Sequence, residues 1–184
     1  AVFACTPDYL DMAARLEFMD GTGVDAQLLS FAGLFGVDSL PVNEALPILQ
    51  AFNDHAATLY RDHPARFGPL ASIPFDNMEA AIEEYRRART ELGLLGAVLP
   101  LDYFVNVATA ERLHPIFAIA GELGGHLFIH PGPRPDQRTD LAEDFAPPIV
   151  DNALWRNQVD VQGRVAHAML TLLMTDLLTS YSGF

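Results

Sequence analysis

The sequence predicts an α/β domain built on a parallel sheet. Two observations carry this prediction: four short apolar runs typical of strands, and stretches of helical periodicity that separate them. Strands that alternate with helices form right-handed βαβ units, and such units give parallel sheets. The 184 residues, 50% of them hydrophobic, are enough for one domain with a sizeable core.

The four predicted strands are short and are bounded by turn residues. Each is too short for a helix, and most do not alternate apolar with polar residues. That pattern is typical of strands that are buried on both faces of a sheet. The predicted strands cover residues 26–31, 68–74, 96–100 and 126–130.

Helical periodicity fills the intervals between these runs. Apolar residues recur three and four positions apart, as at Ala81 and Tyr85. Gly23, Gly93 and Gly124 fall where a helix must end before the next strand, as a left-handed cap requires. The predicted helices cover residues 9–19, 43–61, 78–92 and 109–123, and a fifth runs from about 163 to 178.

The alternation stops after His130. Residues 131–148 contain five prolines and four acidic residues, and we predict a long loop or insertion over 131–162. In a barrel, the loops that follow strands lie on the active-site face, so this loop is a candidate lid or pocket wall. A tolerated surface insertion explains the composition equally well.

Two architectures fit this order of elements: an open doubly wound sheet, or part of a (β/α)8 barrel. The sequence contains no Gly-x-Gly-x-x-Gly or phosphate-loop pattern, which weakens the case for a nucleotide-binding open sheet. The residues by themselves leave the choice between the two open.

Charge and cysteine content narrow the partners that we expect. A net charge of -13 and a pI near 4.6 would repel nucleic acid and anionic membranes, so we expect neither as a partner. Cys5 is the single cysteine and forms no internal disulfide, which favours a cytoplasmic location. The most apolar helical stretch, 166–178, is too short to span a bilayer and contains Asp176.

His130 is the strongest candidate for a chemical role. It ends a predicted strand, and Pro131 and Gly132 follow it at once. Catalytic groups of barrels gather at this end of the strands, where a neutral imidazole can bind Zn²⁺ or act as an acid or base. The alternative is an imidazole that is hydrogen-bonded to a backbone carbonyl. The residues alone favour this alternative slightly, because one histidine does not make a metal site.

Three aromatic residues are candidates for a substrate pocket. Phe31 and Phe75 lie at predicted strand ends and suit an aromatic-lined pocket, although core packing also explains them. Trp155, the only tryptophan, lies beside Arg156 and could form a wall for an aromatic or carboxylate-bearing substrate. It could equally anchor a lid.

Several segments, in order along nearly the whole chain, resemble the amidohydrolase-related family. The resemblance is nearest to the branch that includes aminocarboxymuconate-semialdehyde decarboxylase. The segments that carry it are Met19–Asp25 leading into Leu28–Ser30, Asn53–Asp54, His63–Phe67, Ser72–Pro74, Glu91–Ala97 and Leu127–Pro131.

The resemblance implies a partial (β/α)8 barrel that holds a divalent metal, often zinc. The chain would form a single incomplete domain over 1–184, with about strands 2 to 5 and their helices, lacking the first strand and the last three. His130 would then be a metal ligand, and Trp155 would belong to a substrate-facing segment. The family's H-x-H pair, its histidine after the sixth strand and its aspartate after the eighth have no counterpart among these residues. We therefore expect the catalytic residues outside this sequence, and no activity from these residues alone.

By the same resemblance, we expect the complete enzyme to decarboxylate a small aromatic or muconate-type carboxylic acid without an oxidant, as a homodimer. One alternative is a metal-dependent hydrolase on the same barrel, since barrels host many reactions. The other is a metal-free, non-catalytic α/β binding domain with a flavodoxin-like open sheet.

Overall fold

The computed structural model describes residues 11–31, 36–137 and 153–181, with side chains from residue 161 onward in the last range. Its four strands run parallel: β1 (Gln27–Leu29) pairs with β2 (Phe67–Pro69), and β3 (Gly96–Pro100) pairs with β4 (His126–His130). A parallel bridge from Ala71 to Ala97 joins the two pairs. The predicted parallel α/β organisation is confirmed.

The spatial order of the strands follows their order in the chain. β1 lies beside β2, the residues just after β2 lie beside β3, and β3 lies beside β4. A flavodoxin-like sheet reverses its strand order at a switch point, whereas a barrel keeps the chain order. The described strands show no reversal, so they have the order of a barrel wall.

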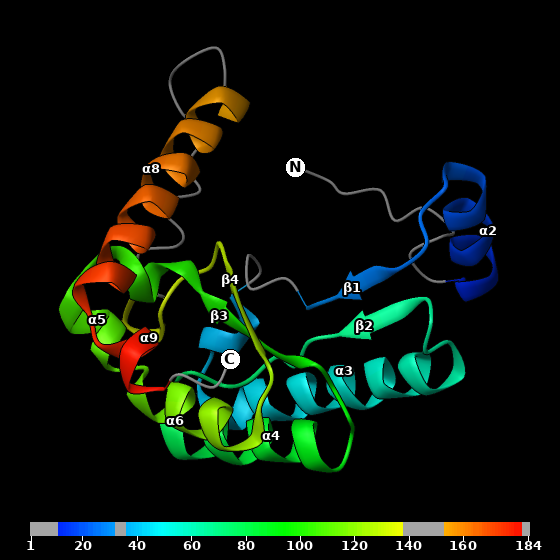
Figure 1. Ribbon diagram of the computed structural model, residues 1–184, viewed down its shortest axis with the longest axis horizontal. Helices are drawn as coiled ribbons and strands as arrows, with labels where there is room; N and C mark the ends of the chain where they lie inside the picture. The colour runs from blue at the N-terminus through cyan, green and yellow to red at the C-terminus, as the bar shows by residue number, and fades with distance from the viewer. Residues whose placement is uncertain (1–10, 32–35, 138–152, 182–184) are drawn as a thin grey trace.

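Three helices lie together along one side of these strands. Figure 1 shows α3 (Val42–Asp62), α4 (Met78–Thr90) and α6 (His114–Leu123) together on that side, with α2 (Met12–Thr22) beside β1. The ends of α2 follow from local chemistry, because the Asp11 carboxylate accepts the N–H of Ala13 at 2.9 Å and Gly23 closes the helix at φ 72°. Gly93 and Gly124 also have positive φ, 71° and 67°. Gly124 ends α6 but has ψ 172°, so it is not the left-handed cap that the sequence predicts.

Several element boundaries differ from the prediction. The single helix expected over 109–123 is two helices, α5 (Val107–Glu111) and α6, because Pro115 occupies the first turn of α6 and cannot continue a preceding helix. The strand predicted over 68–74 is limited to β2 and the bridge at Ala71, and the strand predicted over 26–31 is limited to β1.

The loop predicted over 131–162 is wrong at its carboxyl end. Helix α8 covers Ala153–Met174 and α9 covers Leu177–Ser180, so 153–162 are helical. The physical reason is that the prolines end at Pro148 and no proline or glycine follows before Gly163. Between His130 and α8 the structure describes one short 3-10 turn, η4 (Pro135–Gln137), while 138–152 lie outside the described residues.

A buried polar network fixes α3 and α4 beneath the strands. The Asn53 amide group donates to the Ser72 carbonyl at 3.0 Å and to Glu84 Oε1 at 2.7 Å, and its oxygen accepts from the Ser72 N–H at 2.9 Å. Arg87 donates to both oxygens of Glu84 at 2.9 and 2.8 Å. These bonds satisfy groups that would otherwise be costly to bury, and they anchor the segment after β2.

The far edge of the described sheet is less covered than its centre. Every residue of β3 is buried, whereas β4 is partly exposed and α8 presents the apolar side chains of Met169, Leu173 and Met174 to solvent. Within the described ranges, none of the helices is both long and apolar enough to cross a membrane.

Candidate metal and substrate site

The segments that follow all four strands meet at the carboxyl ends of the sheet. The 3-10 turn η2 (Val37–Ser39) follows β1, and its Asp38 carbonyl accepts the N–H of Phe75 at 2.8 Å. The 3-10 turn η3 (Leu101–Val105) follows β3, and its Asp102 N–H donates to the Gly132 carbonyl at 3.2 Å. Parallel α/β folds place their sites at this end of the strands.

His130 is the last residue of β4 and lies opposite Pro100 of β3. Its Nδ1 is 2.9 Å from the Pro131 carbonyl oxygen. A carbonyl only accepts, so this bond requires Nδ1 to carry the proton, and Nε2 then carries the lone pair. The sequence placed this imidazole correctly at a strand's carboxyl end. The hydrogen bond to a carbonyl, which we gave as the alternative to metal binding, is also the usual way to orient a metal-binding histidine.

The described residues supply one candidate metal ligand. Among them, no three His, Cys, Asp or Glu side chains lie close enough together to hold an ion. The half-buried imidazole of His130 is a donor that both Zn²⁺ and Mn²⁺ accept, so its chemistry fits a divalent metal as one ligand of several.

Asp102 links three segments at this end of the sheet. Arg164 of α8 donates through Nη1 to both carboxylate oxygens of Asp102, at 2.9 and 3.0 Å. Arg134, which follows His130 by four residues, donates to the Asp102 carbonyl oxygen at 2.6 Å and to the Asp136 carboxylate at 3.0 Å. Sequence reasoning identified neither arginine as a partner of Asp102, because neither spacing nor periodicity links them to it.

Asp38 is a buried carboxyl group that sequence reasoning also missed. The residue is 6% exposed, and its Oδ1 has no hydrogen-bond partner within the part of the chain that the structure describes. Burial raises the pKa of Asp38 to about 7, although the backbone N–H groups of Asp38 and Ser39 offset part of that rise. The group therefore titrates near neutral pH.

Tyr103 of η3 is close enough to the Asp38 carboxyl group to be affected by its charge. Burial raises the pKa of Tyr103 to about 12, with the Asp38 carboxyl as a minor cause in the same direction. The Tyr103 ring is 5.5 Å from the Phe75 ring, and the Arg112 guanidinium lies 5.4 Å from the centre of the Tyr103 ring. The phenol thus stays protonated and can serve as a hydrogen-bond donor.

The three predicted aromatic residues have different surroundings. Phe31 follows β1 and is half-buried, with its ring 5.3 Å from the ring of Phe52 on α3. Phe75 is 3% exposed and packs within the hydrophobic core. Trp155 belongs to α8, but its side chain lies outside the described part of the structure. Substrate contact by these three residues stays a prediction.

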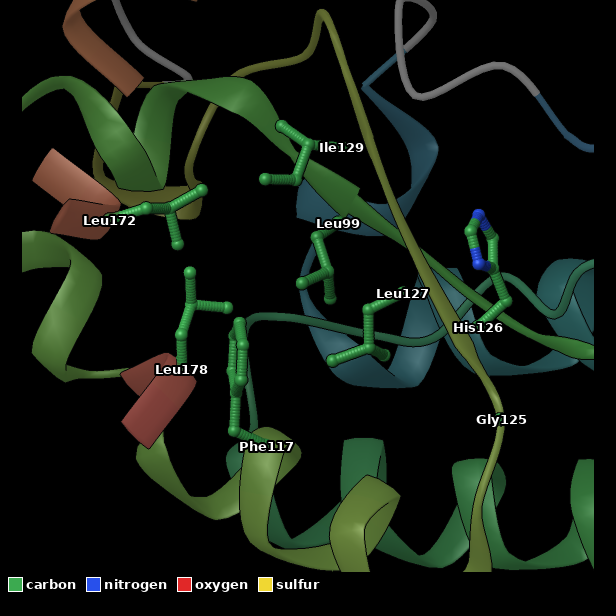
Figure 2. A pocket seen from close by; sticks show the side chains of 8 residues that line it. All are labelled: Leu99, Phe117, Gly125, His126, Leu127, Ile129, Leu172 and Leu178. Carbon is green, nitrogen blue, oxygen red and sulfur yellow. The ribbon is translucent and has the colours of Figure 1, made fainter. Parts of the chain in front are cut away.

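A cavity of about 540 Å³ lies away from this site, on the helix side of the sheet. Figure 2 shows Leu99, Leu127 and Ile129 pointing into it, while the His126 imidazole points away. Because side chains alternate along a strand, His130 lies on the same face of β4 as His126. The cavity has an apolar lining and takes no part in the chemistry proposed for His130. The other five residues that line it are Phe117, Gly125, His126, Leu172 and Leu178.

Comparison with known proteins places the chain in a family. The amidohydrolase family model matches residues 5–180, so the chain belongs to that family. The chain is 35% identical over 122 residues to 2-amino-3-carboxymuconate-6-semialdehyde decarboxylase from Dictyostelium discoideum, a match that covers 66% of this chain and 34% of that protein. The expected family, and its decarboxylase branch as the source of relatives, are confirmed.

Solved structures agree with this assignment. A crystal structure described as amidohydrolase II superposes with a TM-score of 0.75 at 19% identity, over 100% of this chain and 55% of that one, which shows the fold. The 5-carboxyvanillate decarboxylase from Novosphingobium aromaticivorans, solved with manganese, matches at 28% identity and a TM-score of 0.59, over 71% of this chain and 37% of that one. The chain thus spans about a third to a half of the length of these relatives.

Proposed function

We propose that the protein containing this chain is a metal-dependent decarboxylase that removes CO₂, without an oxidant, from a small aromatic or muconate-type carboxylic acid. The observation that carries the proposal is His130, held at the carboxyl end of β4 with Nδ1 on a backbone carbonyl and Nε2 available to a metal. Relatives that are decarboxylases of such acids, one of them solved with manganese, support the same reading.

The residues of this chain have separate parts in the proposal. His130 would hold a divalent metal through Nε2, and a metal bound there would supply Lewis-acid chemistry toward a substrate oxygen. Phe31 and Trp155 form an aromatic wall that orients the acid and excludes water, and Phe75, which packs in the core, supports this wall from behind. The family's H-x-H pair, its later histidine and its aspartate are absent from these 184 residues, so we propose that other parts of the protein supply them.

The choice of metal is a separate part of the proposal. An imidazole suits both Zn²⁺ and Mn²⁺. Zn²⁺ is our expectation from the family resemblance, whereas the related 5-carboxyvanillate decarboxylase was solved with manganese. Activity measured after removal of the metal and reloading with each ion decides between them.

The decisive experiment measures metal content and CO₂ release in the full-length protein. The metal content of His130→Ala is compared with that of wild type and of His126→Ala, a control at the other end of the same strand. ¹³C-carboxyl-labelled 5-carboxyvanillate and 2,6-dihydroxybenzoate are the first substrates to try. We expect His130→Ala to lose metal and to lower CO₂ release by roughly 100-fold or more, while His126→Ala retains both.

Two results would count against the proposal. Hydrolysis of an amide or ester substrate without CO₂ release would favour the hydrolase alternative on the same barrel. Full metal content in His130→Ala would show that this imidazole is not a ligand.

A further inference from the structure

Each of the three residues after His130 has its backbone carbonyl hydrogen-bonded, and the donor is a different residue in each case. The Pro131 carbonyl lies 2.9 Å from His130 Nδ1, the Gly132 carbonyl accepts from the Asp102 N–H at 3.2 Å, and the Pro133 carbonyl accepts from Ser39 Oγ at 2.6 Å. Pro131 and Pro133 have no N–H, so carbonyl oxygens are the main backbone groups through which this segment can be held.

The donors belong to parts of the fold that are themselves fixed. Ser39 is 1% exposed, and its hydroxyl joins residues that are 94 positions apart in the chain. Asp102 follows β3 directly, and Arg134 returns a hydrogen bond to the Asp102 carbonyl at 2.6 Å. The Arg134 N–H also donates to the Gln137 side chain at 2.8 Å, which secures the far end of the segment.

We propose that Ser39 is a positioning residue for His130. By holding the Pro133 carbonyl, its hydroxyl sets the path of 131–133, and that path aims the Pro131 carbonyl at Nδ1. Proline fixes φ at both ends of this short segment, and the Asp102 N–H holds the carbonyl of Gly132 between them, so the three carbonyl contacts set the path together. The result is a single tautomer, with Nε2 directed to the metal. The metal part of this inference rests on the proposed function.

The buried position of Ser39 makes loss of the hydroxyl consequential. Without it, the Pro133 carbonyl keeps its place only by remaining unpaired in a buried environment, and otherwise it turns toward another donor. In both cases the segment 131–133 is held less firmly, and the Pro131 carbonyl is less well oriented toward His130 Nδ1. Loss of a group that orients a metal ligand typically lowers metal affinity about 10- to 100-fold.

The test uses the full-length protein as wild type, Ser39→Ala and a control, Thr58→Ala. Thr58 also donates its hydroxyl to a carbonyl, at 3.1 Å, but within α3 and away from His130. The first measurement is the ¹⁵N spectrum of the metal-free protein at pH 8, where most imidazoles are neutral, with His130 assigned by comparison with His130→Gln. We expect the Nδ1–H tautomer in wild type and in Thr58→Ala, and a mixture of tautomers in Ser39→Ala.

The second measurement is Mn²⁺ affinity by titration calorimetry. We expect Ser39→Ala to weaken binding about 10- to 100-fold and Thr58→Ala to change it less than twofold. If Ser39→Ala does not fold, Ser39→Cys gives the same comparison, since a thiol is a much weaker donor of similar size. A wild-type ¹⁵N spectrum together with wild-type affinity in either Ser39 variant would overturn the inference.

The two proposals fail in distinguishable ways. If His130→Gln binds Mn²⁺ as tightly as wild type, His130 is not a ligand and the proposed function loses its supporting residue. The tautomer measurement needs no metal, so it still decides whether Ser39 positions the imidazole.

Discussion

Asp38→Asn isolates the effect of one buried carboxyl group on stability. Asparagine keeps the shape of the protonated carboxyl but cannot ionise. The pKa of Asp38 is raised from 3.8 to about 7 in the folded chain, chiefly by burial. At 1.36 kcal/mol per pKa unit, a rise of about three units makes ionised Asp38 cost the fold about 4 kcal/mol.

The sign of the effect follows from which state releases its proton first. Below about pH 4, Asp38 is protonated in both the folded and the unfolded chain, so it contributes no penalty. Between about pH 4 and pH 7 the unfolded chain releases the proton while the folded chain retains it, which increasingly favours unfolding. Above about pH 7 the full penalty is present. Asp38→Asn should therefore match wild type near pH 4 and exceed its free energy of unfolding by up to about 4 kcal/mol at pH 8.

The assay is urea unfolding of the full-length, metal-free protein at pH 4, 5.5, 7 and 8, followed by circular dichroism. A chelator is present throughout, because metal binding also depends on pH and would add its own slope. Asp25→Asn, at an exposed position, is the control and should follow the wild-type profile. A stability difference between Asp38→Asn and wild type that stays constant from pH 4 to pH 8 would refute the reasoning.

Three further predictions test other parts of the molecule. Glu84→Ala leaves its buried hydrogen-bonding partners unpaired and should lower the free energy of unfolding by about 3 kcal/mol, whereas Glu83→Ala at the exposed neighbouring position should change it by less than about 0.5 kcal/mol. Gly96→Ala places a Cβ against the backbone of β4 and should lower Tm by several degrees, whereas Gly21→Ala, with open space around it, should not lower Tm. Trp155→Ala should raise KM for an aromatic acid about 10-fold without changing metal content, and an unchanged KM would remove Trp155 from the aromatic wall.

The sequence located some elements to the residue and missed others for identifiable reasons. The strands 96–100 and 126–130 have the predicted bounds, because a short apolar run between turn residues is a local signal. The helix expected over 109–123 divides at Pro115, a breaker that the apolar spacing concealed. The predicted loop fails at its carboxyl end because the proline-rich composition stops at Pro148, whereas α8 begins at Ala153.

The sequence by itself determined the alternation of helices and parallel strands and the place of His130 at a strand's carboxyl end. Both follow from patterns within a few residues of each other. Only the tertiary structure decided that the strands keep their chain order, that Asp38 is buried, and that Ser39 reaches the carbonyl of Pro133. These are contacts between segments far apart in the chain, and no local periodicity encodes which donor meets which acceptor across that distance.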